Sequence, residues 1–334
     1  MPNQNLLKVS GLKTYFYTEP QIIPAVDGVD LTIKKGEILG LVGESGSGKS
    51  VTSLSIMRLF HNTPGKIVDG SITFEEKDLL SQSERAMQSI RGNEIAMIYQ
   101  EPMTSLNPVL TIGEQIEEAI IKHLGYSRKQ ATAHAKKMLE LVGIPRVDSI
   151  IHDYPHQLSG GMRQRVMIAM AMSCSPKLLI ADEPTTALDV TIQAQILDLM
   201  KTLQTTHDLS ILLITHDLGV IAEVCDRVAV MYAGRIVEEA DVFELFEHPK
   251  HPYTQGLMQS MPRLGEHQER LSSIKGQIPA PQEWPKGCKF ATRCPFAFEK
   301  CWQNEPELIL ANPHGHRSRC WLSDEVKETE GVKP

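Results

Sequence analysis

The sequence predicts an α/β fold followed by a cysteine-rich segment near its carboxyl end. Short apolar runs with the composition of buried strands recur along the chain, and one of them, 37–42, leads directly into a glycine-rich loop and a helix. A second apolar run, 177–181, ends in two acidic residues. Four of the six cysteines fall between residues 288 and 320.

Length and charge restrict the class of protein. At 334 residues the chain can form one large α/β domain with an appendage, or two domains. The hydrophobic fraction of 41% and the charged fraction of 22% are ordinary for a globular chain. A net charge of −7 without a basic stripe argues against binding nucleic acid through bulk charge. We therefore expect no nucleic-acid partner.

The first segment, residues 6–34, contains short alternating apolar runs that predict strands flanking the glycine-rich loop. Three consecutive aromatic residues, Tyr15, Phe16 and Tyr17, lie in it. One of these rings could stack on a purine base, while packing at a strand edge or in the core is the alternative. The residues alone leave both interpretations open.

The glycine-rich loop fits the pattern G-x-x-x-x-G-K-[ST] and predicts binding of ATP or GTP. Glycines let backbone N–H groups approach phosphates, and the start of the following helix, 51–60, adds positive potential. Lys49 can reach the β- and γ-phosphates, and the Ser50 hydroxyl can bind Mg²⁺. The alternative, a Gly/Ser turn between strand and helix, would not explain why Lys49 and Ser50 occupy these two positions. The predicted site comprises Gly43, Glu44, Ser45, Gly46, Ser47, Gly48, Lys49, Ser50 and Val51.

A helical insertion is predicted between Gly92 and about Gly143, because 111–124 and 127–142 carry apolar residues at helical spacing. The strand predicted before it, 95–100, ends in Gln100, which by itself is a polar strand end. After the insertion, Ser159, Gly160 and Gly161 precede another predicted helix. They could bind an anion, although a capped helix start is the simpler interpretation.

The acidic strand end, Asp182 and Glu183, predicts a cation site, because burying two carboxylates is costly without compensation. Asp182 suits Mg²⁺ coordination through water, and Glu183 could activate an attacking water. Asp189 begins the next predicted helix. His216 follows the buried strand 211–215 at its carboxyl end, where ligands bind in open α/β sheets. A hairpin over 227–237 is expected to close the sheet.

The order of these motifs resembles the ATP-binding cassette (ABC) family, over roughly Leu6 to Glu247. The resemblance implies an ABC-type P-loop NTPase with a RecA-like core sheet, an antiparallel β subdomain and a helical signature subdomain at about 92–165. We expect an ATPase domain at 6–247, a carboxyl-terminal extension at 248–325 and a polar tail at 326–334.

In that family, two cassettes enclose two ATP molecules, each between the phosphate loop of one subunit and the LSGG segment of the other. The resemblance implies that Glu183 is the general base and that His216 contacts the γ-phosphate. Ser50, Gln100 and Asp182 would hold Mg²⁺, directly or through water. Further implied roles are adenine stacking by Phe16, contact with the partner's γ-phosphate by Ser159, Gly160 and Gly161, and signalling across the dimer by Asp189.

Two further segments, 101–108 and 251–257, resemble the peptide/nickel importer branch of the family, and the chain is most similar to the dipeptide permease type. The implied partners are a second cassette, expected to be a paralogue, two membrane subunits and an extracytoplasmic binding protein. Oligopeptide, nickel or glutathione import are alternatives. A soluble ABC ATPase of translation or DNA repair fits less well, because the chain has one phosphate loop and no heptad run.

The clustered cysteines, Cys288, Cys294, Cys301 and Cys320, predict a metal site in a reducing compartment. Their spacing lacks the close C-x2-C pairs of structural zinc sites, which favours a 4Fe–4S cluster over Zn²⁺. Unliganded thiols or disulfides are the alternative. A structural staple is the expected role, and a redox sensor is a further hypothesis.

The start of the chain shows no charged segment followed by an apolar run and a cleavage site, and no apolar run reaches the 18 to 20 or so residues of a spanning helix. We expect a protein on the cytoplasmic face of the cell membrane, attached peripherally through its partners.

Overall fold

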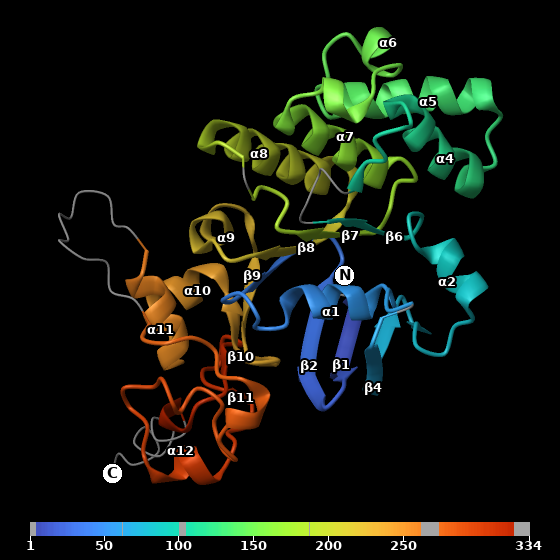
Figure 1. Cartoon of the computed structure of the whole chain (residues 1–334). Coiled ribbons are helices and arrows are strands. Elements are labelled where there is room, and N and C mark those ends of the chain that lie inside the picture. Colours follow the sequence, from blue (N-terminus) through green and yellow to red (C-terminus); the bar gives the residue numbers. More distant parts are fainter. Residues whose placement is uncertain (1–4, 62, 100–104, 187, 262–273, 324–334) are drawn as a thin grey trace. The chain divides into compact units, whose positions relative to one another are not determined.

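The computed structural model describes residues 5–61, 63–99, 105–186, 188–261 and 274–323 (Figure 1). The chain divides into two compact units. The first contains the chain up to Leu6, then Ile33–Ile38 and Phe74–Ile214, and the second contains Leu7–Thr32, Leu39–Thr73 and the chain from Thr215 onward.

The first unit contains parallel strands β6 (Ile95–Ile98), β7 (Leu178–Asp182) and β8 (Ser210–Thr215), paired in the order β6-β7-β8. Every residue of β7 and β8 is buried. Continuous rather than alternating apolar composition is typical of parallel strands covered on both faces. The predicted strands at 177–181 and 211–215 are thus confirmed, and both end at polar residues.

The helices of the first unit include the predicted insertion. Helices α4 (Ile112–Leu124), α5 (Arg128–Leu141) and α7 (Gly160–Met172) pack on one another (Figure 1). Thr111 and Glu114 form a reciprocal capping box that sets the start of α4. The remaining elements of this unit are β5 (Lys77–Asp78), α2 (Glu84–Ile90), α6 (Val147–Ile150), the 3-10 turn Pro155–Gln157 and α8 (Val190–His207).

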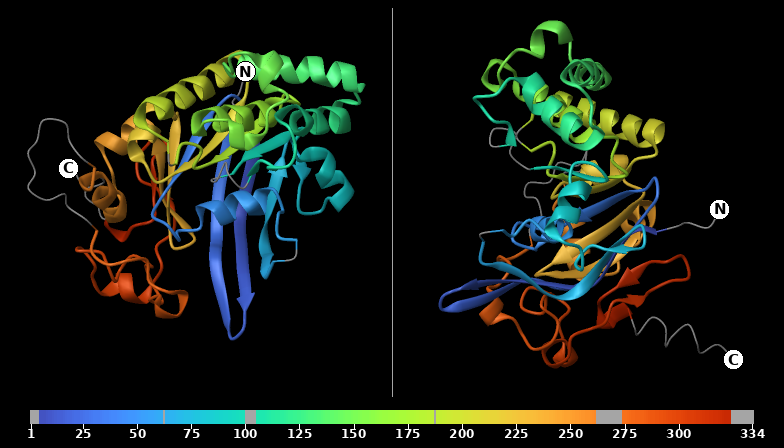
Figure 2. Two further views of the ribbon diagram at one scale, coloured as in Figure 1. Left: turned by 45° about the horizontal axis from the view of Figure 1, so that its top comes forward. Right: turned by 90° about the vertical axis from the view of Figure 1, so that its right-hand side faces the viewer.

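The second unit contains a sheet with β1 (Asn5–Thr18) between β2 (Gln21–Lys34) and β4 (Gly65–Phe74). The long β1–β2 hairpin is drawn in blue in Figure 2. Alternate residues such as Leu7 and Val9 are buried, as the period-2 pattern predicts. Helix α1 (Lys49–Ile56) is shorter than the predicted 51–60, and Arg58 has a left-handed φ of 52° just beyond it.

A second group of strands in this unit has the order β3-β9-β10-β12-β11. β3 (Ile38–Val42) pairs in parallel with β9 (Arg227–Tyr232), which forms the predicted hairpin with β10 (Arg235–Asp241). The last two strands, β12 (Arg317–Ser318) and β11 (Ile309–Leu310), come from the carboxyl-terminal region. That region therefore continues the same sheet. Helix α9 (Leu218–Val224) precedes β9. The helical segments that follow β10 are α10 (Val242–Glu247), α11 (Pro252–Gln259), the 3-10 turn Pro281–Glu283 and α12 (Glu299–Gln303).

A buried carboxylate anchors the carboxyl-terminal region to β10. Glu238 is fully buried and accepts the backbone N–H groups of Lys250 and His251 at 2.5 and 3.0 Å. Its other contact is His316 Nε2 at 2.7 Å, also fully buried. Because a buried carboxylate is costly without hydrogen bonds, these contacts fix the register of the region on the sheet.

Candidate nucleotide site

The glycine-rich loop joins β3 to α1 in the second unit, as predicted. Gly43 and Gly48 have φ of 157° and 107°, in the region that favours glycine. A Cβ on Gly43 would lie 2.2 Å from the Met231 carbonyl, and one on Gly48 would lie 2.4 Å from the Ala25 carbonyl. The close packing of this loop therefore requires glycine at both positions.

Lys49 begins α1, and its ammonium faces back into the loop. Lys49 Nζ donates to the Gly43 and Glu44 carbonyls at 2.8 and 3.1 Å, and only 5% of the residue is exposed. The neighbouring Ser47 hydroxyl is buried and has no hydrogen-bond partner among the described residues. An inward ammonium and an unsatisfied buried hydroxyl in one loop fit a phosphate group that supplies the missing partners.

The acidic end of β7, Asp182 followed by Glu183, lies in the first unit. Asp182 is 5% exposed. Glu183 has a left-handed φ of 49°, its N–H donates to the Ile214 carbonyl at 2.8 Å, and its carboxylate accepts the Thr186 hydroxyl at 2.9 Å. A left-handed φ is strained for a non-glycine residue, and such strain is concentrated at functional sites.

The LSGG segment also belongs to the first unit, where Ser159 caps α7. Its hydroxyl accepts the Met162 N–H at 3.3 Å, while Ser159 and Gly160 remain exposed. Gly161 faces α8: an added Cβ would lie 2.8 Å from Ile192 Cγ2. Asp189 caps α8 by accepting the Ile192 N–H at 3.0 Å. The capped helix start that the residues suggested is therefore present, with an exposed glycine at its tip.

The chain matches two family models: one described as ABC transporter over residues 26–186, and one described as oligopeptide/dipeptide transporter, C-terminal region, over residues 237–301. It is 59% identical to the oligopeptide transport ATP-binding protein AppD of Bacillus subtilis, covering 96% of this chain and 97% of the relative. It is 52% identical to the dipeptide transport ATP-binding protein DppD of Haemophilus influenzae, covering 91% and 92%.

The chain belongs to the ABC transporter ATPase family. A solved structure agrees: the dimeric post-hydrolysis state of the ATP-binding cassette MJ0796 with ADP and phosphate superposes with a TM-score of 0.63 at 28% identity, covering 71% of this chain and 98% of that one. The cassette therefore binds and hydrolyses ATP, for which Mg²⁺ is the expected metal. Among the described residues, no helix has the length and hydropathy needed to cross a membrane.

The remaining predicted residues of the cassette divide between the units. Phe16 is half-buried and packs edge-on against Phe60, with ring centroids 6.0 Å apart. His216 is exposed directly after β8, before Asp217 caps α9. The phosphate loop, Phe16 and His216 belong to the second unit, and Asp182, Glu183, Ser159 and Asp189 to the first. Gln100 lies outside the described residues.

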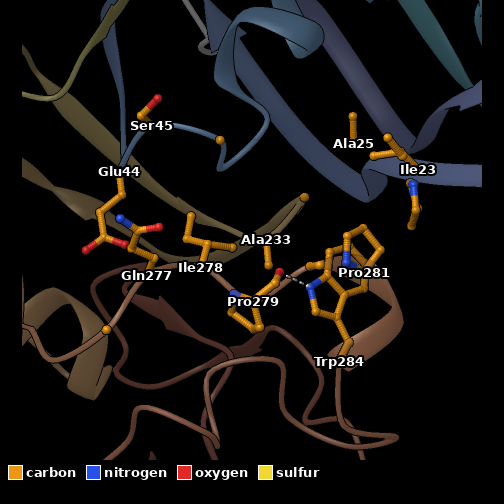
Figure 3. Close-up of a pocket in the computed structure, with 15 residues that line it drawn as sticks. Ile23, Ala25, Glu44, Ser45, Ala233, Gln277, Ile278, Pro279, Pro281 and Trp284 are labelled. Atoms are coloured by element: carbon orange, nitrogen blue, oxygen red, sulfur yellow. Dashed lines mark hydrogen bonds between the residues drawn. The ribbon is translucent and has the colours of Figure 1, made fainter. Parts of the chain in front are cut away.

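The carboxyl-terminal region contributes residues beside the loop that sequence reasoning missed. A cavity of about 610 Å³ lies between residues of the loop and residues 276–284 (Figure 3). Glu44 and Gln277 lie at one end, and Trp284 and Pro281 at the other. The Trp284 indole N–H donates to the Pro279 carbonyl at 2.9 Å, which fixes the ring. No local pattern distinguishes these residues, because their proximity depends on tertiary packing.

An ion-pair network joins the same region to β2. Lys289 is 9% exposed and donates to the Asp27 carboxylate and the Ala233 carbonyl, both at 2.9 Å. Burial lowers the pKa of Lys289 to about 8, although Asp27 opposes the shift. Tyr15 donates to Asp27 at 2.9 Å, and burial together with this carboxylate raises the pKa of Tyr15 to about 12. Tyr15 therefore contributes a hydrogen bond to this ion-pair network.

The four clustered thiols line one small cavity, yet the metal prediction is not confirmed. Cys288, Cys294, Cys301 and Cys320 all border it and are free cysteines. Burial raises the pKa of Cys288 to about 11 and that of Cys320 to about 12. Within the described ranges, no group of three or more His, Cys, Asp or Glu side chains is arranged to hold a metal ion. The thiols share a cavity without forming a ligand set.

Proposed function

We propose that this cassette is the ATP-hydrolysing subunit of a peptide importer, with dipeptides as its cargo. The observation that carries the proposal is the match of residues 237–301 to the oligopeptide/dipeptide transporter region in a chain whose phosphate loop is intact. Relatives named for oligopeptide and for dipeptide transport align over nearly the whole chain. Longer peptides, nickel and glutathione are the competing cargoes.

The working assembly would contain this cassette, a second cassette that is a paralogue, two membrane-spanning permease subunits and an extracytoplasmic peptide-binding protein. ATP would bind the phosphate loop of one cassette and meet Ser159, Gly160 and Gly161 of the other. Closure of the two cassettes on ATP would move the membrane subunits, and hydrolysis would reopen them. The cassette would sit peripherally on the cytoplasmic face of the membrane.

Within this mechanism each residue has one task. The loop N–H groups and Lys49 hold the phosphates, and Phe16 stacks on adenine. Ser50, Gln100 and Asp182 would hold Mg²⁺, which neutralises phosphate charge when bound. Glu183 accepts the proton of the attacking water, and His216 donates a hydrogen bond to the γ-phosphate. Asp189, which caps α8, would signal across the dimer.

Labelled uptake tests this function. Cells carrying the chain are compared with cells carrying Lys49→Ala, with Lys8→Ala as the matched control because Lys8 is exposed on β1. We expect Lys49→Ala to abolish dipeptide uptake and Lys8→Ala to leave it unchanged. Loss confined to longer peptides, nickel or glutathione would overturn the dipeptide assignment, and unchanged uptake of all four would overturn the importer.

The extension, 248–325, would carry a 4Fe–4S cluster on the four cysteines, with Zn²⁺ as the alternative metal. The shared cavity supports this, because cysteine thiolates are the ligands that both metals take. The cysteines would then staple a region short of regular structure. Anaerobically purified protein should be brown, with broad absorption near roughly 400 nm. Colourless protein with stoichiometric zinc would refute the cluster, and protein without metal would refute the site.

A further inference from the structure

The carboxyl-terminal region contacts the phosphate loop at its second residue. The Glu44 carboxylate receives both terminal nitrogens of Arg293, with Nη1 to Oε2 at 2.7 Å and Nη2 to Oε1 at 3.0 Å. The backbone N–H of Glu44 donates to the Tyr253 hydroxyl at 2.8 Å. Two residues more than 200 positions away in sequence therefore hold the side chain and the backbone of Glu44.

The two residues that hold Glu44 are themselves buried and held in place, although the Glu44 side chain is 29% exposed. Tyr253 is fully buried, with its ring 4.7 Å from that of Tyr232, and the Arg293 side chain is only 5% exposed. Arg293 Nε also donates to the Lys275 carbonyl at 2.9 Å, and Nη2 donates to the Gly276 carbonyl at 3.0 Å. Because the guanidinium is a rigid planar fork, these bonds fix its orientation toward the loop.

A single peptide group transmits this restraint to Lys49. The peptide between Gly43 and Glu44 donates its N–H to Tyr253 and offers its carbonyl to Lys49 Nζ at 2.8 Å. Peptide groups are planar, so holding the N–H also sets the direction of the carbonyl. The ammonium that must meet the β- and γ-phosphates is therefore placed by a peptide whose other side is held by the carboxyl-terminal region.

We propose that Arg293 and Tyr253 are positioning residues for ATP: they fix the Gly43–Glu44 peptide so that the loop and Lys49 are pre-arranged for the phosphates. This inference rests on ATP binding at the loop and goes beyond it by assigning the carboxyl-terminal region a part in nucleotide affinity. Preorganisation raises affinity by removing the cost of ordering the loop when the ligand arrives.

A purely structural role for Arg293 is the competing interpretation, and Arg319 provides the matched control. Arg319 belongs to the same region, and its guanidinium donates to the Ile236 and Pro306 carbonyls at 2.9 and 3.1 Å. These bonds dock the region on the sheet at residues other than those of the loop. Arg319→Gln should therefore lower the melting temperature and leave the affinity for ATP unchanged.

The test measures ATP affinity, KM and kcat on the full chain in its assembled complex, with a fluorescent ATP analogue for the binding step. Arg293→Gln should raise the Kd and the KM for ATP about tenfold, the effect expected for losing a charge-assisted hydrogen bond. Its kcat should fall much less. Tyr253→Phe keeps the ring and removes the oxygen, so a rise in Kd of about threefold is expected.

A double-variant cycle isolates the ion pair. Glu44→Gln should also weaken ATP binding. The double variant Glu44→Gln with Arg293→Gln should lose less affinity for ATP than the two single losses combined, because neither partner is then left as an unpaired charge. Equal shifts in Kd for Arg293→Gln and Arg319→Gln, or no shift for Arg293→Gln, would overturn the inference. A wild-type chain that does not bind ATP would instead overturn the proposed function.

Discussion

Two glycine-bearing segments each begin a helix, and they differ in what surrounds them. At the phosphate loop, the positions of added Cβ atoms on Gly43 and Gly48 are occupied by backbone carbonyls, and Lys49 is nearly buried. At the LSGG segment, Ser159 and Gly160 are exposed, and among the described residues a Cβ on Gly160 would meet only Leu188 Cδ2, at an ordinary 3.8 Å. The conformation of the phosphate loop is restricted by residues packed around it, whereas that of the LSGG segment is stabilised by the Ser159 cap of its own helix.

This difference fits the roles we propose. A loop that binds ATP within its own chain gains from preorganisation, and it is packed accordingly. A segment that meets the ATP of another cassette must keep its N–H groups accessible, and it stays exposed. Gly161, the inner glycine, has a different reason: it allows close approach to Ile192 of α8.

The largest effect is expected on the hydrolysis of the ATP that the phosphate loop binds. Glu183→Gln should keep ATP binding and reduce turnover at least about 100-fold, because the amide cannot accept a proton from water. Steady-state ATPase and nucleotide binding on the assembled complex measure both quantities. Glu94→Gln, a glutamate that pairs with Lys77 at 3.2 Å in the same unit, is the control and should hydrolyse normally. Turnover of Glu183→Gln at the wild-type rate would refute the general-base assignment.

A smaller effect is expected from packing within the phosphate loop. Gly46 and Gly48 both have positive φ, of 80° and 107°, but only a Cβ on Gly48 meets a backbone carbonyl. Gly48→Ala should therefore lower the free energy of unfolding by about 1–3 kcal/mol more than Gly46→Ala. Urea unfolding of the two variants measures the difference. Equal destabilisation would mean that φ alone, rather than packing, requires glycine here.

Adenine stacking should contribute less. Phe16→Ala should weaken ATP binding about threefold to tenfold, as expected when one aromatic contact is lost. Tyr17→Ala, at a ring that is 44% exposed, is the control. Because Phe16 also packs on Phe60, the melting temperature is measured alongside. If Tyr17→Ala weakens binding and Phe16→Ala does not, the stacking ring has been misassigned.

The smallest effect concerns a surface ion pair of the first unit. The hydrogen bond from Lys177 lowers the pKa of Glu75 below 4.5, so the folded state binds its proton less tightly than the unfolded chain. The pair should therefore stabilise above pH 4.5, by at most about 1 kcal/mol, and lose its effect as the pH falls through the folded-state pKa. Urea unfolding of wild type and Lys177→Met from pH 3 to 6 measures this. A difference in the free energy of unfolding between wild type and Lys177→Met that grows as the pH falls would contradict this expectation.

The sequence predicted what depends on local pattern. The phosphate loop, the acidic end of β7 and the helix pair α4–α5 follow from spacing within a few residues, and each is present. The contact of Arg293 with Glu44 spans 249 positions and has no local signature. The four cysteines show the limit of local pattern: their clustering predicted a metal site, and the structure places all four around one cavity, but spacing does not determine whether their sulfur atoms converge on a metal.

Turnover of the assembled complex carrying Gly160→Glu tests the central contrast most directly. An acidic residue in the first turn of a helix is favourable, so the variant should fold normally and its isolated chain should bind ATP with wild-type affinity. The added charge would face the γ-phosphate held by the second cassette and should lower turnover at least about tenfold. Unchanged turnover, or a loss of ATP binding by the isolated chain, would contradict an LSGG segment that acts on another cassette.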